Sequence, residues 1–372
     1  MNVNLNHSLD QSQQIEWDRF WGQCEHTHPR NHLLFGRIER ARGRTPVYAT
    51  GEVDGRLVCA GIFSTRPLLG GNRGSLEAVC QRGPIFDDVG YARDFLLEAA
   101  NRFRELNVGG LRISPYWIYP EAEAVESLLG ELSFCVYEGD GKRTPTGLVD
   151  LRPSEEEIFA GLRSKTRQEI RRAERLGVSI KPADSFEEAK PFYKCLSGLH
   201  QQRSLDAISF REFEATFEYI FKKRELGVLL NAFYGSTFLG GLWIVRGPKV
   251  SHHARFVVER EKLRDLANLT IGAALWWEAI KWAKSKGCTW LNVEGYEVGV
   301  DKTHPRYYVY KLKKKFNPQP AQIIAEHVFV CNSSIYAIYK GCRFYQRGVN
   351  FSRGLGYQLK SRWAGYRDPN AV

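Results

Sequence analysis

Two adjacent histidines are one candidate for acid–base chemistry. His252 and His253 lie in the strand-like segment VSHHARF, residues 250–256. Side chains alternate across a strand, so only one histidine of the pair can face a cleft. A neutral imidazole there could take a proton from an attacking amine. We predict this role for His253; the alternative is a hydrogen-bonded histidine of the core.

Regularly spaced basic residues are a second candidate, here for binding phosphate. The arginines recur every four residues, at Arg163, Arg167, Arg171 and Arg175, and Lys165 and Arg172 lie beside them. On one helix face, like charges at this spacing repel by about 0.2–0.5 kcal/mol per pair. The alternatives are a solvated face laced with Glu–Arg pairs and a phosphate-binding surface, in which we place Lys165, Arg167 and Arg171.

A single helix within residues 154–180 is expected to carry these basic side chains. Ser154 and Glu157 fit a capping box at its start, and Gly177 can supply the left-handed residue that ends it. Apolar residues recur at helical spacing along the segment, which predicts one buried stripe.

A weak internal repeat indicates how the rest of the chain is organised. Residues 48–67 resemble residues 229–248, and Gly55 and Gly61 recur as Gly235 and Gly241 at one offset (235 − 55 = 241 − 61 = 180). Each copy reads as a strand, a glycine turn and a strand. A strand, a helix and a strand are predicted to follow in both halves: 76–80, 92–106 and 110–114, then 250–258, 270–286 and 289–294.

Length, composition and charge limit the number of domains and the kind of partner that we expect. At 372 residues the chain is long for one core and sufficient for two. A composition of 43% hydrophobic and 26% charged residues is typical of a soluble globular protein. The formal net charge of +11 favours an anionic partner such as nucleic acid, a nucleotide or a phosphorylated lipid.

Other segments bear on the compartment and on metals. The polar N-terminal stretch does not fit a signal peptide and no apolar run is long enough to span a bilayer, so we expect a cytoplasmic protein. The eight cysteines are scattered without zinc-site spacing, which predicts reduced thiols and no metal.

The basic segment also carries a family resemblance. SKTRQEIRRAERLGV, residues 164–178, resembles the T-R-x-x-I-R-x-A-x-x-x-G-V stretch of the Fem family of peptidoglycan-bridge aminoacyltransferases. The resemblance implies an α+β fold of two GNAT-like domains, each a mixed, mostly antiparallel sheet flanked by helices. It places domain 1 at residues 1–147, with 318–372 packing back on it, and domain 2 at residues 148–317.

The resemblance further implies site residues near the end of the second domain. Residues 307–316, YYVYKLKKKF, resemble the family's aromatic-x-F-K-x-x-F segment, with Leu312 in place of the usual Phe. In the family the next lysine lies by the acyl-transfer site, which implies a catalytic Lys313 and a substrate contact for Tyr310. A fixed ammonium could stabilise a developing oxyanion; the alternative is a solvated lysine patch.

Four more positions follow from resemblance. Arg203 matches by position an arginine that contacts acceptor phosphates in Fem-like enzymes, although it could be a surface arginine at a helix end. Asn268 precedes a helix where the family usually shows Pro-Asn, and a helix N-terminus suits an anion. Residues 291–295 resemble a strand-end Asp-x-x-Gly segment of saccharide acyltransferases, which makes Asn292 and Glu294 substrate-contact candidates, or simply residues that satisfy a strand end.

The donor is predicted from a missing motif. Acetyl-CoA-dependent GNAT enzymes usually place R/Q-x-x-G-x-G/A between a strand and a helix, where glycine amides cradle the pyrophosphate. The matching stretch, EKLRDLAN at residues 261–268, has no glycine. We therefore expect aminoacyl-tRNA as the donor co-substrate, with no tightly bound cofactor, and an amine on a phosphate- or saccharide-bearing acceptor.

Two alternative functions stay open. One is an acyl-CoA-dependent N-acyltransferase acting on an amino sugar or amino acid. The other is a non-catalytic protein that binds RNA or an envelope precursor. Basic and aromatic residues alternate from Tyr339 onward, which suits RNA or a peripheral membrane contact, or a terminal helix packed inward.

Overall fold

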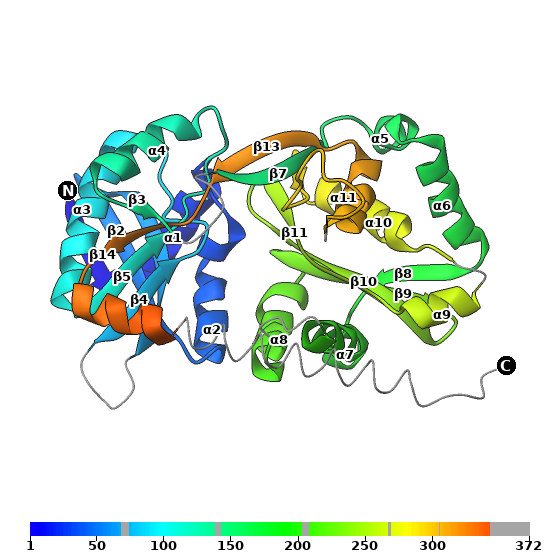
Figure 1. Cartoon of the computed structure of the whole chain (residues 1–372), viewed down its shortest axis with the longest axis horizontal. Helices are drawn as coiled ribbons and strands as arrows, with labels where there is room; N and C mark the ends of the chain where they lie inside the picture. The colour runs from blue at the N-terminus through cyan, green and yellow to red at the C-terminus, as the bar shows by residue number, and fades with distance from the viewer. Residues whose placement is uncertain (68–73, 138–142, 203–207, 267–268, 305, 343–372) are drawn as a thin grey trace.

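Two seven-stranded sheets organise the computed structural model, which describes residues 1–67, 74–137, 143–202, 208–266, 269–304 and 306–342. The sheets stand side by side, each flanked by helices (Figure 1). Their strand orders are β1-β2-β3-β4-β5-β14-β6 and β13-β7-β12-β11-β10-β9-β8. Strands β4–β5 and β11–β12 pair in parallel, and the other described pairs are antiparallel. The predicted α+β class with mostly antiparallel sheets is confirmed.

We call the parts built on the two sheets the first and second domains. The first contains β1 (Asn2–Asn6), α1 (Gln11–Gln23), η1 (Pro29–Asn31), α2 (Leu33–Ala41), β2 (Thr45–Val53), β3 (Arg56–Pro67), β4 (Ser75–Cys80), α3 (Val89–Glu105), β5 (Val108–Ile113), α4 (Ala122–Glu131), β6 (Cys135–Val136) and β14 (His327–Val330).

The second domain begins at β7 and ends at β13. It contains β7 (Arg143–Asp150), α5 (Glu155–Gly161), α6 (Ser164–Arg175), β8 (Val178–Pro182), α7 (Phe186–Gln202), α8 (Phe210–Thr216), the π-helical turn η2 (Phe217–Phe221), β9 (Gly227–Tyr234), β10 (Thr237–Arg246), β11 (Val250–Val258), α9 (Arg260–Asp265), α10 (Gly272–Ser285), β12 (Trp290–Asn292), α11 (Tyr307–Lys313), η3 (Lys314–Phe316) and β13 (Gln319–Ile324). The chain thus crosses between the sheets after β6 and again after β13. The domain boundaries at residues 147 and 317 remain a prediction.

The internal repeat corresponds to a repeated order of elements. In the first domain, β2, β3, β4, α3 and β5 follow one another, and in the second domain β9, β10, β11, α10 and β12 have the same order, with the short helix α9 inserted before α10. Each helix is the crossover that a parallel strand pair requires. Both hairpins turn at a glycine in the left-handed region, Gly55 at φ +73 and Gly235 at φ +56.

A shared apolar cluster joins the two domains. Each domain has its own core, and a third cluster contains buried side chains from both, among them Trp17 and Tyr48 of the first domain and Phe192 and Phe213 of the second. Helices α1 and α2 supply one side of this cluster, and α7 and α8 supply the other. Apolar burial therefore fixes how the two sheets meet.

The basic segment forms two helices, so the prediction of a single helix is wrong. The capping box at Ser154 is present and Gly177 is left-handed (φ +78), as expected. Between α5 and α6, however, Leu162 is extended (ψ 149) and its side chain is buried, 3% exposed. Arg167 donates to the carbonyls of Ala160 and Leu162, which the break leaves without helical partners.

The C-terminal part of the described chain returns to the first sheet. β14 pairs with β5 and β6, and the helical residues 333–342 pack Tyr336 and Tyr339 against it. The basic and aromatic tail from residue 343 lies outside the described residues. All eight cysteines lie within the described ranges and carry free thiols. Among the described helices, none combines the length and the apolar character that a membrane span requires.

Candidate active site

The site lies where two parallel strands of the second sheet separate. β11 and β12 pair only as far as His252 and Asn292, after which β12 ends while β11 continues to Val258. The chain then turns through Glu294 and Gly295, both left-handed, at φ +52 and +47. This parting leaves a gap in the sheet that side chains must fill.

Asn292 fills part of the gap and is a positioning residue in this structure. Its Oδ1 accepts from Thr146 Oγ1 (2.5 Å) and from the Glu294 backbone N–H (2.7 Å), and its Nδ2 donates to Tyr116 Oη (3.0 Å). The side chain is fully buried. With both ends of the amide bonded, Asn292 fixes the turn that carries Glu294.

Glu294 is held as an ionised carboxylate by two partners. Oε1 lies 3.1 Å from His252 Nδ1, and Oε2 accepts from Arg82 Nη2 at 2.9 Å. Burial alone would raise the pKa of Glu294, but the charge of Arg82 and the bond with His252 outweigh it and lower the pKa to about 2. Arg82 comes from the loop after β4, so the first domain contributes to this contact.

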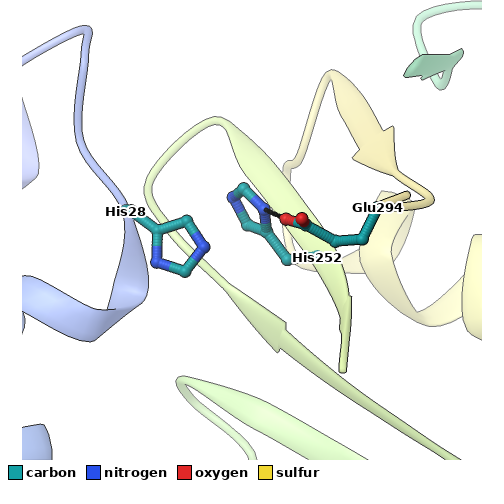
Figure 2. Close-up of side chains that lie close together, drawn as sticks. All are labelled: His28, His252 and Glu294. Carbon is teal, nitrogen blue, oxygen red and sulfur yellow. Dashed lines mark hydrogen bonds and ion pairs between the residues drawn. The ribbon is translucent and has the colours of Figure 1, made fainter. Parts of the chain in front are cut away.

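A second histidine from the first domain completes the cluster. His28 precedes η1, and its ring centroid lies 4.1 Å from that of His252. One ligand atom each of His28, His252 and Glu294 lie within 4.8 Å of one another (Figure 2). Burial is the largest cause that lowers the pKa of both histidines, so both rings are neutral at neutral pH.

His253, the predicted base, faces the other side of the sheet. Its ring stacks on Trp276 of α10, with centroids 4.9 Å apart and planes at 28°. Burial, and next the charge of Lys313, lower the pKa of His253 to about 3. The alternation of strand side chains therefore holds as predicted, and the structure pairs His252 with Glu294.

Lys313 donates hydrogen bonds to the same turn. Its ammonium, on a side chain 5% exposed, donates to the backbone carbonyls of Glu294 and Gly295, the latter at 3.4 Å. Burial lowers the pKa of Lys313 to about 8, although the charge of Glu294 opposes this shift. Tyr310, one turn earlier on α11, stacks on Tyr296 with centroids 5.2 Å apart.

Of the residues predicted to bind phosphate, two are exposed to solvent and one is bonded to the backbone. Lys165 and Arg171 are exposed on α6, whereas Arg167 is occupied by backbone carbonyls. Arg171 also lines an open cavity of about 570 Å³, together with more acidic than basic side chains. Glu169 of α6 pairs with Lys315, which brings α6 next to the Lys313 segment. Arg203 and Asn268 lie outside the described residues.

His28, Arg82 and Tyr116 are site residues that the sequence did not reveal. All three belong to loops of the first domain and lie more than 130 residues before β11. Spacing along the chain carries no signal of such a meeting. The doubled histidine was the one local indication.

The buried histidines predict a marked loss of stability in acid. In the folded protein their pKa values lie below the ordinary value. Their contribution to the free energy of unfolding is therefore complete above about pH 6.5 and is lost as the pH falls toward the pKa values of the folded state. Each should add up to about 1.4 kcal/mol per pH unit to the slope of unfolding free energy. His253→Phe, which keeps the stack on Trp276, should flatten the slope by about one histidine below pH 6.5. Urea unfolding at several pH values measures this, with exposed His7→Gln as control; an unaltered slope in His253→Phe would contradict it.

Comparisons with known proteins show which domain and which fold the chain resembles. Residues 160–301 match the family model described as the acetyltransferase (GNAT) domain. No curated protein matches the chain. Among solved structures, the crystal structure of FemX is similar over 91% of this chain and 99% of its own, with a TM-score of 0.75 and 13% identity.

Two further structures share the tandem arrangement. A tandem GNAT protein from the clavulanic acid biosynthesis pathway is similar over 89% of this chain and 99% of its own (TM-score 0.52, 12% identity). A conserved protein of unknown function from Bacteroides thetaiotaomicron is similar over 88% and 99% (TM-score 0.53, 11% identity). Residues 160–301 thus match a GNAT acetyltransferase domain, and the chain as a whole has the fold of a tandem pair of such domains. This is the Fem-like pair of domains, which confirms the predicted resemblance.

Proposed function

We propose that the protein transfers an aminoacyl group from aminoacyl-tRNA to an amine of an acceptor that bears phosphate or saccharide. The observation that carries the choice of donor is the start of α10. Leu312 covers Gly272, the first residue of this helix, where an added Cβ would meet Leu312 Cδ1 at 3.1 Å. Residues 260–265 before it form helix α9 without a glycine. This packing supports a donor other than coenzyme A.

The exposed cations of α6 support tRNA as the donor. Lys165, Arg171 and Arg175 are exposed, and the chain carries a net charge of +11. Contacts of this kind to a phosphate backbone release counterions, so binding should weaken as salt rises.

In the proposed reaction the enzyme supplies position and charge stabilisation. The acceptor amine attacks the ester carbonyl carbon of the donor, and the carbonyl oxygen becomes an oxyanion. The Lys313 ammonium has three N–H groups, and two are directed at the carbonyls of Glu294 and Gly295. In this proposal the third N–H faces the oxyanion.

A second candidate is transfer from an acyl-CoA to the same kind of amine. The match of residues 160–301 to an acetyltransferase domain model favours it. The two candidates differ in the donor and share the amine and the site.

Thermal shift separates the two donors. Purified protein is heated with aminoacyl-tRNA, with uncharged tRNA, and with a panel of acyl-CoA thioesters. At a free concentration about 100-fold above Kd, a native-state ligand stabilises by about 2.7 kcal/mol, a rise of several degrees. We expect a rise with aminoacyl-tRNA that diminishes in high salt. A rise with acyl-CoA alone would replace the proposed donor by acyl-CoA.

A further inference from the structure

One ring nitrogen of His252 is hydrogen-bonded to Glu294, and the other has no hydrogen-bond partner among the described residues. The Glu294 carboxylate, ionised at neutral pH, can only accept, so Nδ1 of His252 must carry the proton of their 3.1 Å bond. Nε2 of the neutral ring is then an unprotonated acceptor. It is buried and has no hydrogen-bond partner among the described residues. An unpaired buried polar atom costs about 1–3 kcal/mol, which points to a ligand that it is built to meet.

Residues of the first domain cover this nitrogen. His28 Nδ1 accepts from the Arg30 backbone N–H at 3.1 Å, so its ring proton lies on Nε2. Figure 2 shows the Nε2 edges of the two imidazoles turned toward each other. The Tyr116 ring lies edge-on to His252 at 5.1 Å, and its hydroxyl is bonded to Asn292. The free acceptor thus sits between the two domains.

A cavity shares Arg82 with the cluster. It measures about 200 Å³ and is lined by Arg30, Gln81, Arg82, Ser114, Thr144, Ile324 and Glu326. Arg82 also holds the second oxygen of Glu294, so the cavity and the His252–Glu294 pair share this guanidinium. Arg30 and Arg82 bring two cations to this cavity against one carboxylate, Glu326, which favours an anionic acceptor.

We propose that His252 Nε2 takes the proton from the attacking amine, that Glu294 is the positioning residue that orients and stabilises the imidazole, and that His28 completes the site from the first domain. The inference rests on the transfer to an amine proposed above, and it is independent of the donor. Carboxylate-oriented imidazoles of this kind act as general bases in acyl transfer.

The amine nitrogen forms a bond to the carbonyl carbon, and its proton passes to His252 Nε2. The tetrahedral intermediate then breaks its bond to the ribose oxygen of the tRNA, or to the sulfur of an acyl-CoA. That leaving atom takes the proton from the imidazolium, which restores the neutral ring and yields an amide.

His28, His252 and Glu294 could instead hold a metal ion, but their hydrogen bonds favour a role of His252 as general base. A metal bound through His252 Nδ1 would displace the hydrogen bond to Glu294 and leave Nε2 with a proton and no acceptor, whereas a metal-bound histidine almost always donates its second N–H. A metal bound through Nε2 would meet a Glu294 whose two oxygens are already bonded, one to His252 and one to Arg82. Arg82, 2.9 Å from Glu294 Oε2, also disfavours a second cation.

The first test is independent of any substrate. In the full-length protein labelled with ¹⁵N-histidine, we expect His252 to show a protonated Nδ1 and a bare Nε2. Glu294→Gln should remove or shift this Nδ1–H signal, and Glu297→Gln, an exposed neighbour, should not. A proton on Nε2, or stoichiometric zinc binding by calorimetry that His252→Gln abolishes, would overturn the proposal, the latter in favour of a metal site.

The second test follows transfer to glucosamine 6-phosphate as the acceptor probe, with aminoacyl-tRNA and with acetyl-CoA. We expect His252→Gln and Glu294→Gln each to lower kcat by about 100-fold with little change in KM. The double variant should fall little further, because the two residues act as a unit. Unchanged kcat in either single variant would overturn the proposal. If the wild type uses neither donor, the proposed function fails, and the NMR test still decides where the proton lies.

Discussion

Lys313→Ala is expected to lower kcat by about 100-fold or more, with a much smaller change in KM. The buried ammonium donates to the carbonyls of Glu294 and Gly295, at the turn where β11 and β12 part. Removal of one preorganised donor from an oxyanion site costs about 10²–10³ in kcat. The variant also leaves these two carbonyls without their charged donor, so part of the loss comes from movement of the turn.

The two contributions can be measured separately. Steady-state kinetics of Lys313→Ala and of Lys313→Met, which keeps the volume, give the loss of turnover. The ¹⁵N signals of His252 report whether Glu294 is still in place. Exposed Lys311 lies on the same helix, and Lys311→Ala is the matched control. Wild-type kcat in both Lys313 variants would remove this residue from the site.

Much of the fold could be predicted because its signals are local or repeated. The two hairpins turn at Gly55 and Gly235, whose left-handed conformations a side chain rarely adopts. The strand, helix and strand that follow each hairpin have period-2 and helical patterns readable in a short window. The constant offset between the halves then indicated two similar units, which the sheets confirm.

The break between α5 and α6 shows where local signals fail. Leu162 has helical spacing from Ile158, so the pattern continues across it. In the structure its side chain enters the core of the second domain, and the backbone extends to allow this. Tertiary burial therefore overrides the local helical preference. Arg167, predicted to bind phosphate, instead satisfies the carbonyls that the break exposes.

Candidate site residues were predicted from the sequence only in the second domain. Lys313 and Glu294 were proposed through resemblance, and the structure brings them together at one turn, while their roles stay predictions. Which histidine faces Glu294 depends on the register of β11 against β12, with His252 opposite Asn292. A shift of one residue reverses the answer, and no local pattern fixes it. His28 enters through domain packing, which lies beyond any sequence window.

Arg42→Met is expected to lower the free energy of unfolding by about 3 kcal/mol. Arg42 follows α2 of the first domain and bonds Glu212 of α8 in the second at 2.6 Å. It also bonds Glu39, whose other oxygen accepts from Ser64 Oγ at 2.7 Å. The three charged side chains are between 10% and 22% exposed. Removal of the cation leaves two nearly buried carboxylates unpaired, and breaking such a buried pair costs about 3–5 kcal/mol.

Urea unfolding of single and double variants tests this contact. Glu212→Gln should destabilise less than Arg42→Met, because the Arg42–Glu39 pair remains. The double variant should show a coupling energy of about 1–3 kcal/mol. Exposed Glu218→Gln, on the adjoining η2 turn, is the matched control. A loss below about 1 kcal/mol in Arg42→Met would mean that this ion pair contributes little to the contact between the domains.

The same variant is also expected to lose turnover, because the proposed base site is divided between the domains. His28 and Arg82 come from the first domain, and His252 and Glu294 from the second. A small change in how α2 meets α8 would move His28 relative to His252, and misplacement by about 1 Å can cost about 100-fold in rate. Measured below its unfolding transition, Arg42→Met should therefore lower kcat while the Nδ1–H signal of His252 persists, because His252 and its acceptor Glu294 both belong to the second domain.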